Sequence, residues 1–149
     1  MIDVHCHILP DVDDGSECMQ ESINMAMIAK EQGIDKIIAT PHYHPEFKYL
    51  KGEELNKACE EFKKQLKENN IDIEIYLGNE IYFTYDLIEK ISELDFYCLN
   101  KSKYILIEFP PTNFPLNLCN IVYELKQKGF IPVLAHVERY IKIHDDPEI

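Results

Sequence analysis

The sequence predicts an α/β protein built from parallel β-strands. Short apolar segments recur five times along the chain, and segments with helical periodicity separate them. Such alternation indicates parallel strands joined by right-handed crossovers. The length of 149 residues is that of one ordinary domain. Two architectures satisfy this pattern: an open doubly wound sheet, or part of a β/α barrel.

Five segments are predicted to be strands. They cover residues 2–7, 35–40, 73–79, 103–109 and 131–136. Most are short runs of Ile, Val, Leu, Tyr or Phe, as expected for strands of a parallel sheet that is covered on both faces. No Gly-x-Gly-x-x-Gly motif or P-loop motif follows any of them. Dinucleotide-binding and P-loop versions of the open sheet therefore lose support.

Four segments between these strands are predicted to be helices. They cover residues 18–32, 53–69, 84–94 and 116–128, of which residues 84–94 have the weakest pattern. In the first, Met19, Ile23 and Ala26 fall on one stripe, which is the pattern of a helix that packs on a sheet. Gly33 follows as a predicted C-terminal stop.

Composition excludes several classes of protein. Fifteen Lys and Arg residues against 27 Asp and Glu residues give a net charge of −12, which would repel nucleic acids and anionic membranes. No apolar run approaches the roughly 18 residues of a membrane span, and no signal peptide is visible. We therefore expect a cytoplasmic protein that binds no nucleic acid and is not embedded in a membrane.

Histidines gather at the ends of the predicted strands. His5 and His7 alternate along the first strand, so both imidazoles point to one face and offer half of a divalent metal site. Such a pair is a weak motif alone. It gains weight because five of the six histidines, namely His5, His7, His42, His44 and His136, lie within a few residues of strand ends. The sixth, His144, lies in a polar tail and receives no role.

Acidic residues follow the same strand ends. Glu80 and Glu108 each come after an apolar segment, where a buried carboxylate costs several kcal/mol unless it is paired or binds a metal. The chain has a single arginine, so a metal is favoured over a structural ion pair. Asp14 belongs to an Asp-Asp-Gly segment that also suits a simple turn. We predict it to be a ligand because it follows the first strand.

Together these side chains predict a catalytic metal centre. Mixed His and carboxylate ligands without thiolates suit Mn²⁺, Fe²⁺ or Zn²⁺, and several carboxylates in one pocket favour two or more ions. Such centres catalyse displacement at phosphorus or at a carbonyl. Arg139 is predicted to bind two phosphate oxygens, with a surface salt bridge as the alternative. A cysteine-dependent phosphatase is excluded, because the position six residues before Arg139 is Val133 rather than a cysteine.

Five motifs together resemble the metal-dependent tyrosine phosphatases of bacterial capsule and exopolysaccharide clusters. These phosphatases form the CpsB/CapC type of the polymerase-and-histidinol-phosphatase (PHP) superfamily. The motifs are HCHILPDVDDG, ATPHYH, GNE, YILIEFP and AHVER, and they span nearly the whole chain. The resemblance implies a distorted (β/α)₇ barrel that holds two or three metal ions, usually manganese. It also implies, as the substrate, phosphotyrosine on a partner bacterial tyrosine kinase that controls polysaccharide export.

The resemblance also assigns individual residues. By position, the metal ligands are His5, His7, Asp14, His42, Glu80, Glu108 and His136. Arg139 matches the phosphate-binding arginine of the family and is the predicted catalytic residue. Asp11 and Val137 are minor departures, since the family usually has Gly and Pro at these positions.

A further departure concerns ligands that the family supplies late in its sequence. These are an Asp and a His in an Asp-x-His motif, which does not occur in the later part of this chain. Five strands cannot close a seven-stranded barrel, so we expect residues 1–149 to be the N-terminal portion of one PHP-type phosphatase domain, incompletely closed. We also expect this portion to self-associate, and the site formed by Glu80, Glu108 and His136 to be the best retained.

Two alternatives stay open. One is a PHP-type phosphatase of a small phosphomonoester such as histidinol phosphate, which the sequence does not separate from a tyrosine phosphatase. The other is a catalytically inactive metal-binding relative, which the absent late ligands favour.

Overall fold

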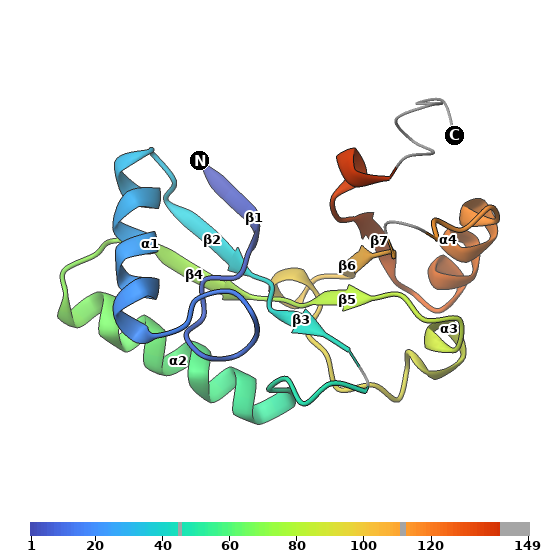
Figure 1. Cartoon of the computed structure of the whole chain (residues 1–149), viewed down its shortest axis with the longest axis horizontal. Coiled ribbons are helices and arrows are strands. Elements are labelled where there is room, and N and C mark those ends of the chain that lie inside the picture. The colour runs from blue at the N-terminus through green and yellow to red at the C-terminus, as the bar shows by residue number, and fades with distance from the viewer. Residues whose placement is uncertain (45, 111–112, 141–149) are drawn as a thin grey trace.

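Two parallel sheets lie side by side in the protein (Figure 1). The computed structural model describes residues 1–44, 46–110 and 113–140. The first sheet has the order β1-β2-β4, with strands Ile2–Cys6, Lys36–Ala39 and Glu74–Leu77. The second has the order β3-β5-β6-β7, with strands His42–Tyr43, Glu80–Tyr82, Tyr104–Glu108 and Ile131–Leu134. Every pairing within these sheets is parallel, as the strand–helix alternation predicts.

Helices cover both sheets. They are α1 (Met19–Glu31), α2 (Gly52–Glu68), α3 (Leu87–Lys90) and α4 (Leu118–Gln127). Helices α1 and α2 lie with the first sheet, and α3 and α4 with the second (Figure 1). Gly33 has a φ of +82°, which confirms the predicted end of the first helix. No helix in the described part of the chain is long and apolar enough to cross a membrane.

The helix predicted over residues 84–94 is much shorter in the structure. Only Leu87–Lys90 is helical, and the chain then turns so that Leu94 and Phe96 reach the same core as Leu87. Tertiary packing thus overrides the weak helical pattern of this segment.

Two predicted strands are each continued by a second short strand beyond a break. The break between β2 and β3 contains Pro41, which has no N–H to donate to a ladder. The matching break between β4 and β5 contains Asn79, whose amide donates to the Pro41 carbonyl over 2.9 Å and accepts from the Tyr97 N–H over 2.8 Å. The sequence analysis predicted neither β3 nor β5. Their pairing sets His42 opposite Glu80.

Each sheet has its own hydrophobic core. Leu55, Phe62 and Leu66 of α2 are buried against the first sheet, and each contributes roughly 1.5–3 kcal/mol through burial. In the second core, the hydroxyl of Tyr140 accepts a hydrogen bond from the Phe109 N–H over 3.0 Å. This contact anchors the segment after β7 to the end of β6. The cores therefore fix the strand ends from which the site is built.

Candidate metal centre

The predicted ligands converge where strands of both sheets end. His5 lies in β1, His42 in β3, Glu80 in β5 and Glu108 in β6, whereas His7, Asp14 and His136 lie in segments that follow β1 and β7. In parallel α/β folds the loops after the strands carry the functional groups, so this position agrees with the prediction. His144 lies outside the described residues.

Glu80 occupies the centre of the cluster and is completely buried. Four imidazole nitrogens, of His5, His7, His42 and His136, lie between 3.0 and 3.2 Å from its carboxylate oxygens. Burial opposes the negative charge, but contacts with His5 and His7 hold the pKa of Glu80 well below its ordinary value. None of these contacts has the geometry of a good hydrogen bond to either oxygen, although the imidazole nitrogens lie within reach. A buried carboxylate that is surrounded by imidazole nitrogens but poorly aligned with them is a strong candidate for a metal ligand.

The imidazoles are arranged as metal ligands are. The Nε2 atoms of His5 and His7 lie 3.3 Å apart, and two nitrogens bound to one tetrahedral ion at about 2.1 Å would be about 3.4 Å apart. Three overlapping sets of ligand atoms, with all atoms of a set within 4.8 Å of one another, could each hold an ion. The sets are His5 with His7 and Glu80, His7 with Asp14 and His42, and His42 with Glu80 and Glu108. Because the sets share residues, the donor groups fit a cluster of ions better than one isolated ion.

Glu108 and His136 approach the cluster at different ligands. Oε2 of Glu108 lies 4.0 Å from Nδ1 of His42, and the expected grouping of Glu80, Glu108 and His136 stays a prediction. His136 contacts Glu80 from the other side, where its ring centroid is 4.7 Å from that of His5. The register of β3 sets His42 opposite Glu80, where Nδ1 of His42 lies 3.2 Å from Oε2 of Glu80.

Asp13 is a site residue that the sequence analysis missed. Its Oδ2 lies 2.7 Å from Nδ1 of His7, and it accepts backbone hydrogen bonds from His42 and Gly15. Burial alone would raise the pKa of Asp13, but His7 and these hydrogen bonds lower it. Burial likewise disfavours a charged His7, yet Asp13 and Glu80 raise the pKa of His7 to about 10. A carboxylate on one ring nitrogen orients the other nitrogen toward a metal.

The backbone at Gly15 and at His136 has unusual geometry next to the cluster of candidate ligands. A Cβ on Gly15 would lie 2.4 Å from Cβ of His7 and 2.5 Å from its carbonyl oxygen, so only glycine fits there. His136 has a φ of +51°, a conformation that is uncommon for residues other than glycine and typical of functional sites. The short 3₁₀ helix η2 (Val137–Arg139) begins directly after it.

Arg139 shares a cavity of about 270 Å³ with the candidate ligands. The other lining residues are His7, Asp14, Gly15, His42, Glu108 and His136. The alternative, a surface salt bridge, is also present, because Nε of Arg139 lies 3.8 Å from the exposed carboxylate of Glu138. Such exposed pairs contribute little to stability, so this contact does not prevent Arg139 from binding an anion. The guanidinium is 58% exposed as a side chain and therefore accessible to an anionic ligand in the cavity.

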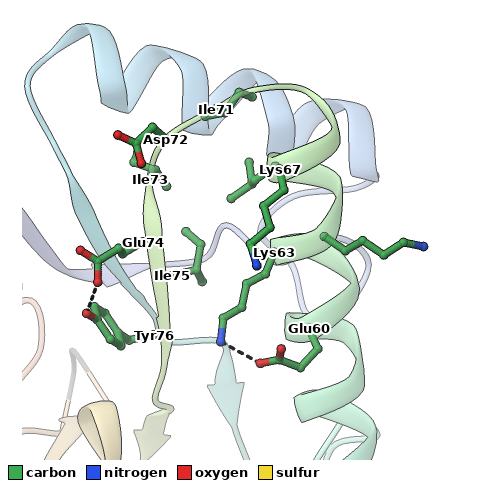
Figure 2. Close-up of a pocket in the computed structure, with 11 residues that line it drawn as sticks. Glu60, Lys63, Lys67, Ile71, Asp72, Ile73, Glu74, Ile75 and Tyr76 are labelled. Atoms are coloured by element: carbon green, nitrogen blue, oxygen red, sulfur yellow. Dashed lines mark hydrogen bonds and ion pairs between the residues drawn. The ribbon is translucent and has the colours of Figure 1, made fainter.

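A larger hollow of about 510 Å³ lies elsewhere, between α2 and β4. Figure 2 shows Lys63 of α2 paired with Glu60 over 2.8 Å, and the Tyr76 hydroxyl bonded to Glu74 of β4. None of its 11 lining residues is a histidine or a cysteine. Its three acidic residues are balanced by three lysines, and none of the candidate metal-ligand sets found in the described part of the chain lies there.

Cys6 and Cys59 are poor candidates for a nucleophile. Burial raises the pKa of the Cys6 thiol to about 12 and that of Cys59 to about 11. Both thiols are therefore neutral at physiological pH, and only a thiolate is nucleophilic.

Comparison with known proteins agrees with this geometry. A family model described as "Capsular polysaccharide synthesis, CpsB/CapC" matches residues 1–149. The tyrosine-protein phosphatase YwqE of Bacillus subtilis is 38% identical over 149 residues, which are 100% of this chain and 59% of YwqE. The tyrosine-protein phosphatase CpsB of Streptococcus pneumoniae is 34% identical over 140 residues, which are 94% of this chain and 58% of CpsB.

A solved structure has the same fold. It comes from a study of YwqE and CpsB, described there as unique metal-dependent tyrosine phosphatases. It superposes with a TM-score of 0.90 at 39% identity, over 99% of this chain and 60% of the solved chain. The chain thus spans about three fifths of the length of the proteins that it matches.

Proposed function

The chain belongs to the CpsB/CapC family of capsular polysaccharide synthesis, and on this basis we propose that it is a metal-dependent protein-tyrosine phosphatase. The proposed substrate is phosphotyrosine on a bacterial tyrosine kinase that controls capsule or exopolysaccharide synthesis. Relatives over nearly the whole of this chain are named tyrosine-protein phosphatases. The observation that carries the proposal is the completely buried Glu80 carboxylate, whose oxygens lie 3.0–3.2 Å from nitrogens of four imidazoles without a well-aligned hydrogen bond to any of them.

We propose that seven residues hold two or more divalent ions, with manganese as the first choice. They are His5, His7, Asp14, His42, Glu80, Glu108 and His136. Divalent ions held there supply Lewis acidity and neutralise charge on a phosphate ester. The mixed nitrogen and oxygen donors fit Mn²⁺, and the absence of thiolates among these seven residues disfavours a structural zinc site.

The remaining roles fall to protein groups that are not ligands. Arg139 binds two oxygens of the phosphate as a planar fork and so orients the ester in the cavity. Asp13 accepts a hydrogen bond from the Nδ1–H of His7 and so leaves the lone pair of Nε2 directed at the cluster. Gly15 leaves room for the backbone of His7.

The proposal includes the architecture around the site. We propose that the two sheets are part of a distorted (β/α)₇ barrel within one PHP-type domain, with β1 and β7 at the unclosed edges. Support comes from the approach of His5, on β1, to His136, which follows β7. A cytoplasmic location belongs to the same proposal, since the kinase substrate implied by the family acts there.

Hydrolysis of a phosphotyrosine peptide by residues 1–149 tests this function. Because residues 1–149 lack the late Asp-x-His motif of the family, we expect their turnover with Mn²⁺ to be low and to rise in a chain extended to carry that motif. EDTA should abolish the turnover, and Glu80→Gln should lower it at least about 100-fold. Glu74→Gln is the matched control, because Glu74 is an exposed carboxylate that pairs with Lys36 outside the cluster. Faster turnover of histidinol phosphate than of the peptide would replace the proposed substrate. Metal binding without turnover, both in residues 1–149 and in a chain extended to carry the late Asp-x-His motif, would identify an inactive relative.

A further inference from the structure

A small hollow with aromatic walls adjoins the cavity of Arg139. Its volume is about 130 Å³, and its lining residues are His42, His44, Phe47, Tyr49, Tyr82 and Glu108. His42 and Glu108 line both hollows, so the two share a wall. The aromatic hollow therefore begins at the candidate metal ligands and leads away from them.

The aromatic walls come from two segments of the chain. His44, Phe47 and Tyr49 follow β3, whereas Tyr82 ends β5. The ring centroid of His44 lies 4.4 Å from that of Phe47 and 5.0 Å from that of Tyr82. Phe47 is in turn 5.7 Å from Tyr49. These are the distances of contacting aromatic pairs, yet Phe47 is 57% exposed and therefore offers a free apolar surface.

We propose that this aromatic hollow receives the ring of an aryl phosphate whose phosphate group lies in the Arg139 cavity. The inference rests on the function proposed above and assigns Phe47 and Tyr82 as residues that determine specificity. A phenolic ester has its ring directly beside its phosphate, and the two hollows have the same arrangement. An alkyl phosphate would leave the aromatic walls without a partner, so the hollow favours tyrosine esters over serine, threonine or sugar esters.

The size of the hollow agrees with one ring. An apolar cavity of about 150 Å³ in another protein binds benzene, so about 130 Å³ is the scale of a single six-membered ring. Contact between aromatic rings adds about 0.5–1.5 kcal/mol beyond the burial of area. Loss of one wall together with its buried area should therefore weaken ring binding by about tenfold.

The test compares phenylphosphonate with methylphosphonate, which are not hydrolysed, by calorimetry on the manganese-loaded 149-residue chain. Phe47→Ala should raise the Kd of phenylphosphonate about tenfold and change that of methylphosphonate less than about twofold. Phe47→Tyr keeps a ring and should restore most of the preference. Tyr123→Ala is the matched control, because Tyr123 is 63% exposed on α4 and lines neither hollow.

Turnover gives a second readout. The ratio of kcat/KM for phenyl phosphate to that for ethyl phosphate should fall by a similar factor in Phe47→Ala. Equal losses for aryl and alkyl ligands, or an unchanged preference, would overturn the inference. An effect restricted to peptide substrates would do the same, because it would mean that the hollow contacts flanking residues. The binding measurement needs no turnover, so failure of the proposed function is distinguishable from failure of the aromatic hollow.

Discussion

The carboxylate of Asp13 lies 2.7 Å from Nδ1 of His7, so that the other ring nitrogen, Nε2, faces His5 and Glu80. Asp13 also accepts the backbone N–H of His42 and thus ties the loop after β1 to the start of β3. One side chain therefore orients a candidate ligand and joins the two segments that carry ligands. In metal centres such partners contribute to affinity without touching the ion.

From this contact we predict that Asp13→Asn weakens metal binding by about 10- to 100-fold, because the amide cannot orient His7 as a carboxylate does. Competition with a chelator of known affinity measures the change. Asp11→Asn is the control, since Asp11 lies in the same loop and is exposed. Unchanged affinity in Asp13→Asn would mean that Asp13 only shapes the turn.

Removal of a direct ligand should have a larger effect. We expect His5→Ala and His7→Ala each to lower phosphatase activity at least about 100-fold, because each removes a nitrogen donor from a shared set. The bound metal, measured by elemental analysis, should decrease in parallel. Activity that persists in either variant, or in the presence of EDTA, would contradict a metal-dependent mechanism.

Arg139→Lys should chiefly weaken binding of phosphate. Lysine keeps the charge but loses the planar fork, so we expect the inhibition constant of inorganic phosphate to rise about tenfold. Metal content should stay at the wild-type level, because Arg139 lines the cavity and is not a ligand. If the Arg139→Lys variant has the wild-type inhibition constant for phosphate, Arg139 does not bind phosphate and is an ordinary surface residue.

The cysteines should be dispensable for the chemistry. Cys6→Ser tests the thiol that lies between His5 and His7 in the sequence and should leave kcat within about twofold, since its raised pKa keeps it neutral. Cys59 is completely buried, so Cys59→Ser should lower the free energy of unfolding by about 1–3 kcal/mol while the chemistry persists. A folded Cys6→Ser variant without turnover would reinstate a thiolate mechanism.

Sequence periodicity was sufficient to predict the positions of site residues that lie close together along one strand. His5 and His7 share a face because alternate residues of a strand do, and the parallel topology brings the strand ends together. The contact between His42 and Glu80 has a different origin. It requires that the chain break at Pro41 and at Asn79, because the paired strands β3 and β5 begin after these breaks. The Asn79 side chain fixes the backbone there through hydrogen bonds to Pro41 and Tyr97. No local pattern encodes such bonds.

The roles of the adjacent residues Asp13 and Asp14 were also beyond what a local sequence pattern predicts. Asp13 points inward to His7, whereas the Asp14 side chain is 73% exposed and lies 3.4 Å from His42. The sequence analysis assigned a ligand role to Asp14 alone and gave none to Asp13, because an Asp-Asp-Gly turn does not show which carboxylate faces the cluster. Their roles separate only through the fold of the turn, which Gly15 makes possible because a Cβ there would collide with His7.

The last prediction concerns self-association of residues 1–149. Ile2 and Val4 are 58% and 50% exposed, and they lie on one face of β1. Among the described residues β1 pairs only with β2, so its other edge also offers unpaired backbone groups. An apolar edge strand of this kind favours contact with a second copy. We therefore expect dimers or larger species in sedimentation velocity as the protein concentration rises.

The double variant Ile2→Thr with Val4→Thr should shift this equilibrium toward the monomer. Threonine keeps the β-propensity of the strand while it removes apolar surface, so folding and metal content should be retained. Leu116→Thr is the matched control, because Leu116 is 90% exposed in the segment before α4 and lies outside both sheets. If the wild-type chain stays monomeric at every concentration, or if Leu116→Thr acts as strongly as the double variant, the edge of β1 is not the surface that drives association.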